Sequence, residues 1–196
     1  MRHGVTDWNK EMLVEGPQDL SLNSKGQQQV NETIDILQNH CISCIFVSPL
    51  KRCIETAEKV SSALNDIPIF VITDLEERKF GDWSQCREKI RELVEGAPEG
   101  PAFFRYVKDK IEEILPLDAE SLTEFERRAR SGINQALMNS TSYPQYPLII
   151  AHGCVKIACK NGMHRIEDED VPKSFTQPIF FEYDEDKDIW LLTNLD

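Results

Sequence analysis

Short apolar runs rich in β-branched residues alternate with segments of helical periodicity along most of this chain. Ile42–Val47 is such a run, and Ser48-Pro49-Leu50 then turns the chain into a helical pattern over about residues 51–64. Ile67–Ile72 and Leu148–Ala151 have the same short, apolar character, which is typical of buried strands. This alternation predicts an α/β domain, a three-layer sandwich in which helices cover both faces of a mostly parallel sheet.

The other elements complete a single predicted domain over residues 1–196, because the sequence has no internal repeat, low-complexity segment or linker. They are helices at about 24–39, 122–138 and 155–159, a helical, lid-like segment at about 84–118, and two pairing strands at Ile179–Tyr183 and Ile189–Thr193. A Gly- and Pro-rich stretch over residues 96–101 divides the lid-like segment into two helices.

The charge balance excludes several classes of partner. The net charge is −12, from 22 basic and 34 acidic side chains, so wide contact with nucleic acid or an anionic membrane would be repelled. A small phosphorylated substrate stays possible, because a local arginine cluster can dominate the field inside a cleft. No apolar run approaches the roughly 20 residues that span a bilayer, and no secretory signal is visible. We therefore expect a cytoplasmic protein whose six cysteines are reduced.

One cysteine pattern raises the question of a metal. His40-Cys41-x-x-Cys44 has the compact spacing of half a zinc site, but zinc would require a second compact pair of ligands. Cys154, Cys159 and His164 in the chain's second half offer a loose candidate set for the other ligands. Because these form no compact pair, we interpret the pattern as buried thiols at a helix-to-strand junction and expect no metal site.

Two His-Gly pairs stand at strand ends. Arg2-His3-Gly4 has the character of the outgoing end of a strand, and His152-Gly153 follows the apolar run Pro147–Ile150. Because functional sites in parallel sheets gather at the carboxyl ends of strands, both histidines are expected in one site. Almost nothing precedes Arg2, so we expect that the first strand either is unusually short or begins upstream of this sequence.

The residues at these corners suit phosphoryl transfer. His3 is a competent nucleophile because an unperturbed imidazole has a pKa near 6.5. Arg2 and Arg52 can each bind two phosphate oxygens with a planar guanidinium, and the backbone N–H of Gly4 could add a donor. The leaving oxygen needs a proton, which points to a carboxyl group, Glu76 or Glu77, in the charged loop. The next residues, Arg78 and Lys79, are expected to be solvated.

Six motifs, in order, carry a family resemblance. They are "RHGVTDWN", "GPQDLSLNSKG", "SPLKRCIETAE", "LEERKFGDW", "ESLTEFERR" and "IIAHG". With them the chain resembles the histidine phosphatase superfamily, the phosphoglycerate-mutase-like group, over nearly its whole length. The resemblance implies the α/β fold already predicted and a chemistry that uses no metal or cofactor.

The resemblance also implies a role for each matching residue. His3 corresponds to the phosphorylated nucleophile, and Arg2, Arg52 and His152 to ligands of the phosphate. The family's general acid falls on Glu77 rather than on Glu76. Gly4 remains a candidate backbone donor, and the position of Asn9 implies a polar contact to the substrate.

Three positions depart from the family's pattern. Glu15 stands where relatives often carry a neutral polar residue, so an acidic side chain is expected to border the substrate. Ala119 replaces a glycine before "ESL", and Cys154 follows "AHG" where glycine or another small residue is expected. These departures affect the identity of the substrate rather than the chemical groups of the site.

Three functions fit the motifs. The first is a phosphatase that hydrolyses a small phosphomonoester, and the second is a phosphoglycerate mutase, whose branch shields phosphohistidine from water. The third is a catalytically inactive scaffold, which would be marked by loss of His3, Arg52, Glu77 or His152. All four residues are present, which argues against the scaffold. The mutase branch usually has a longer chain with an added insertion and a C-terminal tail, which this sequence lacks, so we expect a phosphoric monoester hydrolase.

Overall fold

The computed structural model describes residues 1–10, 16–82, 87–98, 106, 110–143, 145–155, 176, 178, 180–184 and 189–193, with the backbone alone described at residues 9, 10 and 87 and in the last two ranges. The elements are α1 (Asp7–Lys10), α2 (Ser24–Leu37), β1 (Ile42–Val47), α3 (Lys51–Ala63), β2 (Ile69–Val71), the 3-10 helix η1 (Thr73–Leu75), α4 (Arg87–Glu95), α6 (Leu122–Ser140), β3 (Tyr146–Ile150), β4 (Phe180–Asp184) and β5 (Ile189–Thr193). Residues 110–114 and 153–155 are also helical. Of the helix expected at about 155–159, all but Val155 lies outside the described residues.

β1 is the central strand of a three-stranded parallel sheet with the order β2-β1-β3. Ile45 of β1 lies opposite Ile69 of β2 and Leu148 of β3. Directly after β3, Ala151 forms a further parallel bridge with Arg2. The carboxyl ends of β1 and β3 and the segment that follows Arg2 therefore lie side by side, which is the arrangement that the two His-Gly corners predicted.

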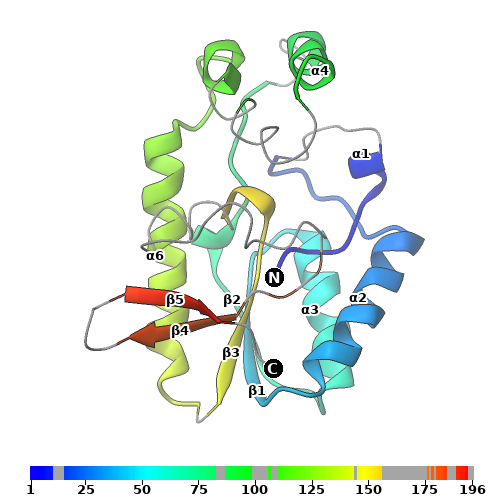
Figure 1. Cartoon of the computed structure of the whole chain (residues 1–196), viewed down its shortest axis with the longest axis vertical. Coiled ribbons are helices and arrows are strands. Elements are labelled where there is room, and N and C mark those ends of the chain that lie inside the picture. Colours follow the sequence, from blue (N-terminus) through cyan, green and yellow to red (C-terminus); the bar gives the residue numbers. More distant parts are fainter. Residues whose placement is uncertain are drawn as a thin grey trace.

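Helices cover both faces of this sheet (Figure 1). Ile45 and Val47 pack in one apolar cluster with α2 and α3, whereas Cys44 and Phe46 pack in another with α6. This division follows from the alternation of side chains along a strand. The predicted α/β fold, with a parallel sheet flanked by helices, is therefore confirmed.

α6 begins at a capping box and presents one apolar face to the sheet. The Ser121 hydroxyl accepts a hydrogen bond from the Glu124 backbone N–H, and the Glu124 side chain reaches back to the Ser121 backbone. This reciprocal pair satisfies two donors that a helix start leaves open. Phe125, Ala129 and Ile133 follow at helical spacing and are buried against the sheet.

A close contact between two glycines fixes the chain just after the first strand end. A Cβ on Gly4 would lie 2.6 Å from the Gly26 carbonyl oxygen, and a Cβ on Gly26 would lie 2.1 Å from the Val5 carbonyl oxygen. The Asn23 backbone N–H also donates to that Val5 oxygen at 3.1 Å. The Gly4-Val5 backbone thus rests directly on the first turn of α2, and side chains at either glycine would separate them.

As the sequence predicted, β4 and β5 pair with one another. The pair is antiparallel, and Tyr183 lies opposite Trp190. α1 and α4 lie at the end of the molecule where β3 leads into the helical turn at 153–155 (Figure 1). None of the helices in the described ranges is long and apolar enough to cross a membrane.

Candidate active site

His3 lies directly after the bridge between Arg2 and Ala151, and its side chain is fully buried. Its backbone N–H donates to the Ala151 carbonyl oxygen at 3.1 Å. Nδ1 lies 2.7 Å from the Gly4 carbonyl oxygen, an acceptor, so Nδ1 carries the proton. Nε2 is therefore unprotonated, and its lone pair accepts a hydrogen bond from Arg52 Nε at 3.2 Å. The ring is held in the tautomer that a nucleophile needs.

Arg52 stands in the first turn of α3, at the carboxyl end of β1, and is among the largest fully buried side chains of the described residues. Two carbonyl oxygens hold its guanidinium: Nη1 donates to Gln18 at 2.5 Å, and Nη2 donates to Gly16 at 2.8 Å. Nη2 also lies 3.2 Å from His152 Nδ1. The cation is therefore fixed between the two histidines by the turn that precedes α2.

His152 follows β3 directly and is also buried. Because Nδ1 accepts from Arg52, Nε2 carries the proton and donates to Ser48 Oγ at 2.8 Å. The rings of His3 and His152 lie 5.2 Å apart between centroids, at 58° to one another. Cys53 Sγ packs on the His152 ring, 3.5 Å from Nε2. His3, Ser48, Arg52 and His152, each at a strand end or a helix start, thus lie together in one buried site.

Both imidazoles are held in the neutral form. Burial lowers the pKa of His3 well below its ordinary value, and the positive charges of Arg2 and Arg52 lower it further. Burial also lowers the pKa of His152, with contributions from His3 and the same arginines. Neutral His3 is the form that can attack phosphorus, so the surroundings favour the nucleophilic state.

The Arg2 guanidinium lies beside the second His-Gly corner. A Cβ on Gly153 would lie 3.5 Å from Arg2 Cζ, an ordinary contact distance, so the arginine head group lies directly against this glycine. The backbone N–H of Gly4 donates to Thr56 Oγ1 at 3.3 Å. That bond turns the amide toward α3, and the donor role of Gly4 toward a phosphate stays a prediction.

Glu77 is buried near both arginines. Burial raises the pKa of its carboxyl above the ordinary value, while hydrogen bonding to the Arg78 backbone N–H and the charges of Arg2 and Arg52 oppose the rise. The Arg78 N–H donates to Oε1 at 3.0 Å. The Cys154 thiol also donates to this carboxyl. A raised pKa favours the protonated acid, which is the form that can give a proton to a leaving group.

The expectation that Arg78 is solvated was wrong. Its side chain is 4% exposed and forms a two-point ion pair with Glu112, in which Nη2 lies 2.9 Å from Oε2 and Nη1 bonds Oε1. Nε and Nη2 also donate to the Glu120 carbonyl oxygen at 2.9 and 2.8 Å. A buried arginine is stable when donors are satisfied in this way. Lys79, by contrast, is exposed as expected.

Two predicted substrate contacts cannot be placed. Asn9 lies in α1, but its side chain is outside the described part of the chain, and Glu15 falls in the segment 11–15, which is not described. The structure brings together Arg2, His3, Arg52, Glu77 and His152. These five residues of the predicted set therefore lie together in one cluster.

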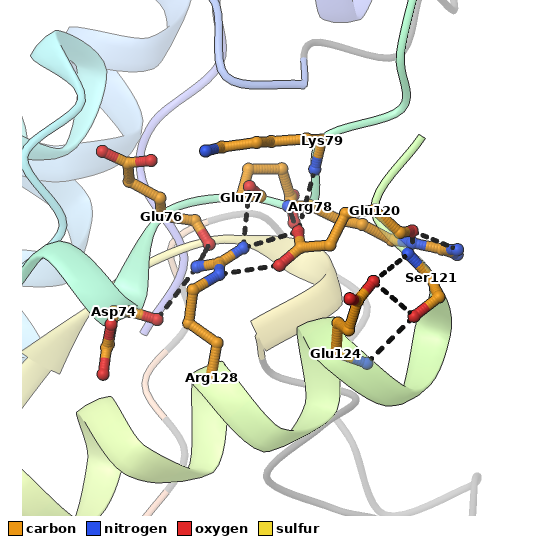
Figure 2. Close-up of polar contacts among 9 residues, drawn as sticks. All are labelled: Asp74, Glu76, Glu77, Arg78, Lys79, Glu120, Ser121, Glu124 and Arg128. Atoms are coloured by element: carbon orange, nitrogen blue, oxygen red, sulfur yellow. Dashed lines mark hydrogen bonds and ion pairs between the residues drawn. The ribbon is translucent and has the colours of Figure 1, made fainter. Parts of the chain in front are cut away.

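The residues that sequence reasoning missed are supports of the pocket. Ser48 binds His152, and the carbonyl oxygens of Gly16 and Gln18 bind Arg52. Arg128 and Glu120 hold the loop that carries the candidate acid (Figure 2). The signal for this last pair was in the sequence, because both residues belong to the motif "ESLTEFERR".

Metal-ligating side chains do not gather in the described part of the chain, where no group of three or more His, Cys, Asp or Glu is placed to hold an ion. Cys44 of the His40-Cys41-x-x-Cys44 pattern is buried in the sheet, whereas Cys41 is exposed. The interpretation of this pattern as buried thiols therefore holds for Cys44 and was wrong for Cys41.

A family model described as the histidine phosphatase superfamily, branch 1, matches residues 1–175. The chain belongs to this superfamily. The phosphatase PhoE of Bacillus subtilis, named as uncharacterized, is 34% identical over 156 residues, which cover 78% of this chain and 69% of that protein. Phosphoglycerate mutase-like protein 4 of Arabidopsis thaliana is 28% identical over 160 residues, covering 79% of this chain and 65% of that protein.

A solved histidine-phosphatase-like structure has the same fold. The α-ribazole phosphatase of Shigella flexneri matches with a TM-score of 0.74 at 21% identity, covering 100% of this chain and 93% of that one. The resemblance stated from the motifs is therefore confirmed, and the phosphatase names support the expected enzyme class, a phosphoric monoester hydrolase.

Proposed function

We propose that this histidine phosphatase hydrolyses a small phosphomonoester through a phosphohistidine intermediate, without a metal ion. The observation that carries the proposal is the contact between His3 and Arg52, in which the lone pair of a neutral imidazole faces a buried guanidinium at 3.2 Å. A phosphoryl group that displaced this hydrogen bond would meet a nucleophile and a cation together. The family and the phosphatase-named relatives support the same chemistry.

The first step transfers the phosphoryl group to the enzyme. Nε2 of His3 attacks phosphorus, the bond from phosphorus to the leaving oxygen breaks, and the Glu77 carboxyl gives its proton to that oxygen. Arg2 and Arg52 neutralise the negative oxygens during the transfer. The alcohol departs, leaving phosphohistidine and a Glu77 carboxylate.

The second step restores the enzyme. Water attacks phosphorus and gives a proton to the Glu77 carboxylate, while the bond between phosphorus and Nε2 breaks. Inorganic phosphate departs, and His3 returns to its neutral tautomer with Nδ1–H bonded to Gly4. The cycle therefore needs a group that donates a proton in one step and accepts one in the next, and the raised pKa of Glu77 suits both tasks.

Transfer of the phosphoryl group to a substrate hydroxyl instead of water is the second candidate, because one relative is named phosphoglycerate mutase-like. The two activities share every step up to phosphohistidine. They differ in the acceptor, so products distinguish them.

The test uses the full chain with 4-nitrophenyl phosphate, a panel of alkyl phosphates and 3-phosphoglycerate. We expect phosphate release by the wild-type protein, and phosphohistidine after an alkaline quench, both lost in His3→Ala. Full turnover by folded His3→Ala would overturn the mechanism. Isomerisation of phosphoglycerate faster than phosphate release would assign a mutase, and a folded wild-type protein that hydrolyses nothing in the panel would be an inactive scaffold.

A further inference from the structure

The loop that carries Glu77 is tied to α6 by one side chain (Figure 2). Arg128 Nη1 donates to the carbonyl oxygens of Asp74 at 3.0 Å and of Glu76 at 2.9 Å. Nη2 approaches the carbonyl oxygen of Glu77 at 3.4 Å. One guanidinium therefore binds three main-chain oxygens within four consecutive residues, which fixes the path of the loop immediately before the candidate acid.

Glu120 orients that guanidinium. Its two carboxylate oxygens accept from Arg128 Nε at 2.8 Å and Nη2 at 2.7 Å, and both side chains are less than one-fifth exposed. A planar two-point pair of this kind has a defined direction as well as a charge. Glu120 also pairs with Lys79 on the far side of Glu77: its Oε2 accepts from the Lys79 N–H at 3.1 Å, and its own N–H donates to the Lys79 carbonyl oxygen at 2.7 Å.

α6 approaches this loop closely one turn further on. Gly132 stands four residues after Arg128 and therefore on the same face of the helix. A Cβ at Gly132 would lie 3.0 Å from Asp74 backbone carbon and 3.1 Å from Leu75 Cδ2. The absence of a side chain at Gly132 thus lets the helix come near enough for the Arg128 guanidinium to reach the carbonyl oxygens of the loop.

The Arg128 contact with Glu77 is to the main chain, while the Glu77 carboxyl bonds the Arg78 N–H. Arg128 can therefore set where the acid stands through the main chain, while its charge acts on the site through His152, whose pKa it lowers. General-acid catalysis is sensitive to such placement, because the proton must lie within hydrogen-bond reach of the leaving oxygen.

We propose that Arg128, held by Glu120, is a positioning residue for Glu77 and that it sets the rate at which esters with basic leaving groups react. This inference rests on the proposed function, in which Glu77 protonates the leaving oxygen. An ester of an acidic phenol needs little protonation, whereas an alkyl ester needs a well-placed acid. Loss of Arg128 therefore lowers turnover of alkyl esters more than turnover of aryl esters.

The experiment compares kcat/KM for glycerol 2-phosphate and for 4-nitrophenyl phosphate in wild type, Arg128→Met, Glu77→Gln and the double variant. We expect Glu77→Gln to lower the alkyl-to-aryl ratio by about a hundredfold, the lower range for a general acid, and Arg128→Met to lower it by about tenfold or more. In the Glu77→Gln background the Arg128 change should lower the ratio no further, because the two act through one group.

Arg127→Met is the matched control, since Arg127 is the preceding residue of α6 and is exposed. It should leave the ratio at the wild-type value. If Arg128→Met does not fold by circular dichroism, Arg128→Lys and Glu120→Gln replace it, because each keeps the size of the side chain and removes part of the planar pair.

Two results overturn the inference alone: an Arg128 variant that retains the wild-type ratio, or one that lowers the ratio equally with and without Glu77. A wild-type protein that hydrolyses neither ester overturns the proposed function, and the role of Arg128 with it. A ratio that falls in Glu77→Gln and stays unchanged in the Arg128 variants would leave the proposed role of Glu77 intact and overturn only the role of Arg128.

Discussion

Arg52 fixes the two pocket histidines in opposite tautomers. It donates to Nε2 of His3 and to Nδ1 of His152, while Gly4 and Ser48 accept from the other ring nitrogens. Burial lowers the pKa of both rings, so neither carries a charge that would compete with the guanidinium. In the proposed mechanism, an entering phosphoryl group thus meets a lone pair and a cation already in place, which reduces the reorganisation that the transition state requires.

Glu77 should control the basic limb of the pH–rate profile. The acid must be protonated, so kcat/KM falls as the pH rises through the pKa of Glu77, which burial raises. Because the Cys154 thiol donates to the carboxyl and so favours its charged form, Cys154→Ala should move this limb to higher pH. Steady-state hydrolysis of an alkyl phosphate between pH 5 and 9, a range of about four units around neutrality, would measure the shift.

Glu77→Gln provides the reference for that measurement. An amide does not titrate in this range, so the basic limb should disappear and the remaining activity should be low. A limb that persists unchanged in Glu77→Gln would assign it to another group. A limb that moves to lower pH in Cys154→Ala would mean that the thiol raises the pKa of Glu77 instead of lowering it.

His3 and His152 should also make the fold sensitive to mild acid. Their pKa values are lower in the folded protein than in the unfolded chain. Their stabilising contribution is therefore complete above the unfolded pKa of about 6.5 and is lost as the pH falls from there toward the folded pKa. Each histidine should contribute a slope of up to about 1.4 kcal/mol per pH unit to the free energy of unfolding.

Urea unfolding at a series of pH values from neutral downward measures this slope. His3→Gln and His152→Gln should each flatten it, since glutamine is polar but does not titrate. If both variants keep the wild-type slope, the acid sensitivity belongs to other groups.

The elements around the pocket are arranged so that three chain segments end together. Ser48 follows β1, and Arg52 lies in the first turn of α3, the next element. His152 lies just after β3, and His3 lies just after the bridge at Arg2. The first turn of α2 supports the last of these through the contact between Gly4 and Gly26. The position of the nucleophile therefore depends on a helix start that contributes no side chain to the chemistry.

Gly26→Ala tests this support. Alanine favours a helix by about 1 kcal/mol over glycine, but its Cβ would overlap the Val5 carbonyl oxygen, and overpacking costs about 1–3 kcal/mol. We expect a net loss in the free energy of unfolding, and a fall in kcat of about tenfold or more because His3 is displaced. Chemical denaturation and steady-state kinetics measure the two effects.

Lys25→Ala is the control, because Lys25 is exposed in the same turn of α2. It should leave kcat unchanged. Wild-type kcat in a folded Gly26→Ala variant would show that the backbone after His3 can shift without cost to the site.

The molecule as a whole is acidic, yet its pocket gathers cations. Against a net charge of −12, Arg2 and Arg52 both interact with the buried His3 and Glu77. Two guanidinium groups among buried side chains concentrate positive potential locally, which favours small anions over extended ones. The substrate expected from this field is a compact phosphate ester.

Inorganic phosphate should accordingly stabilise the whole fold. At 100 times its Kd, phosphate adds about 2.7 kcal/mol to the free energy of unfolding, which corresponds to a rise in Tm of roughly 5–10 °C for a chain of this size. Differential scanning fluorimetry against chloride at equal ionic strength measures the rise. Arg2→Met should reduce it, and an equal rise with chloride would show general screening instead of a bound anion.

The sequence predicted the layers and the proximity of the five candidate site residues, because periodicity and ordered motifs are local signals. Ile42–Val47 and the helix that follows it could be identified without knowledge of any partner. The roles of Arg78 and Arg128 could not, since their burial depends on residues 34 and 54 positions away. Charged residues in a loop or on the polar side of a helix favour a solvated interpretation, and only the folded chain supplies the acceptors that bind them.

The parallel pairing of β1 with β3 has a consequence for the order in which the protein folds. Arg52 meets His152 across 100 residues of chain, so the site closes through a long loop. Contacts of such separation form late, because the entropy of loop closure must be overcome first. Anion binding during refolding should therefore appear together with the last kinetic phase, and a bound oxyanion would serve as a reporter that the chain has reached its native topology.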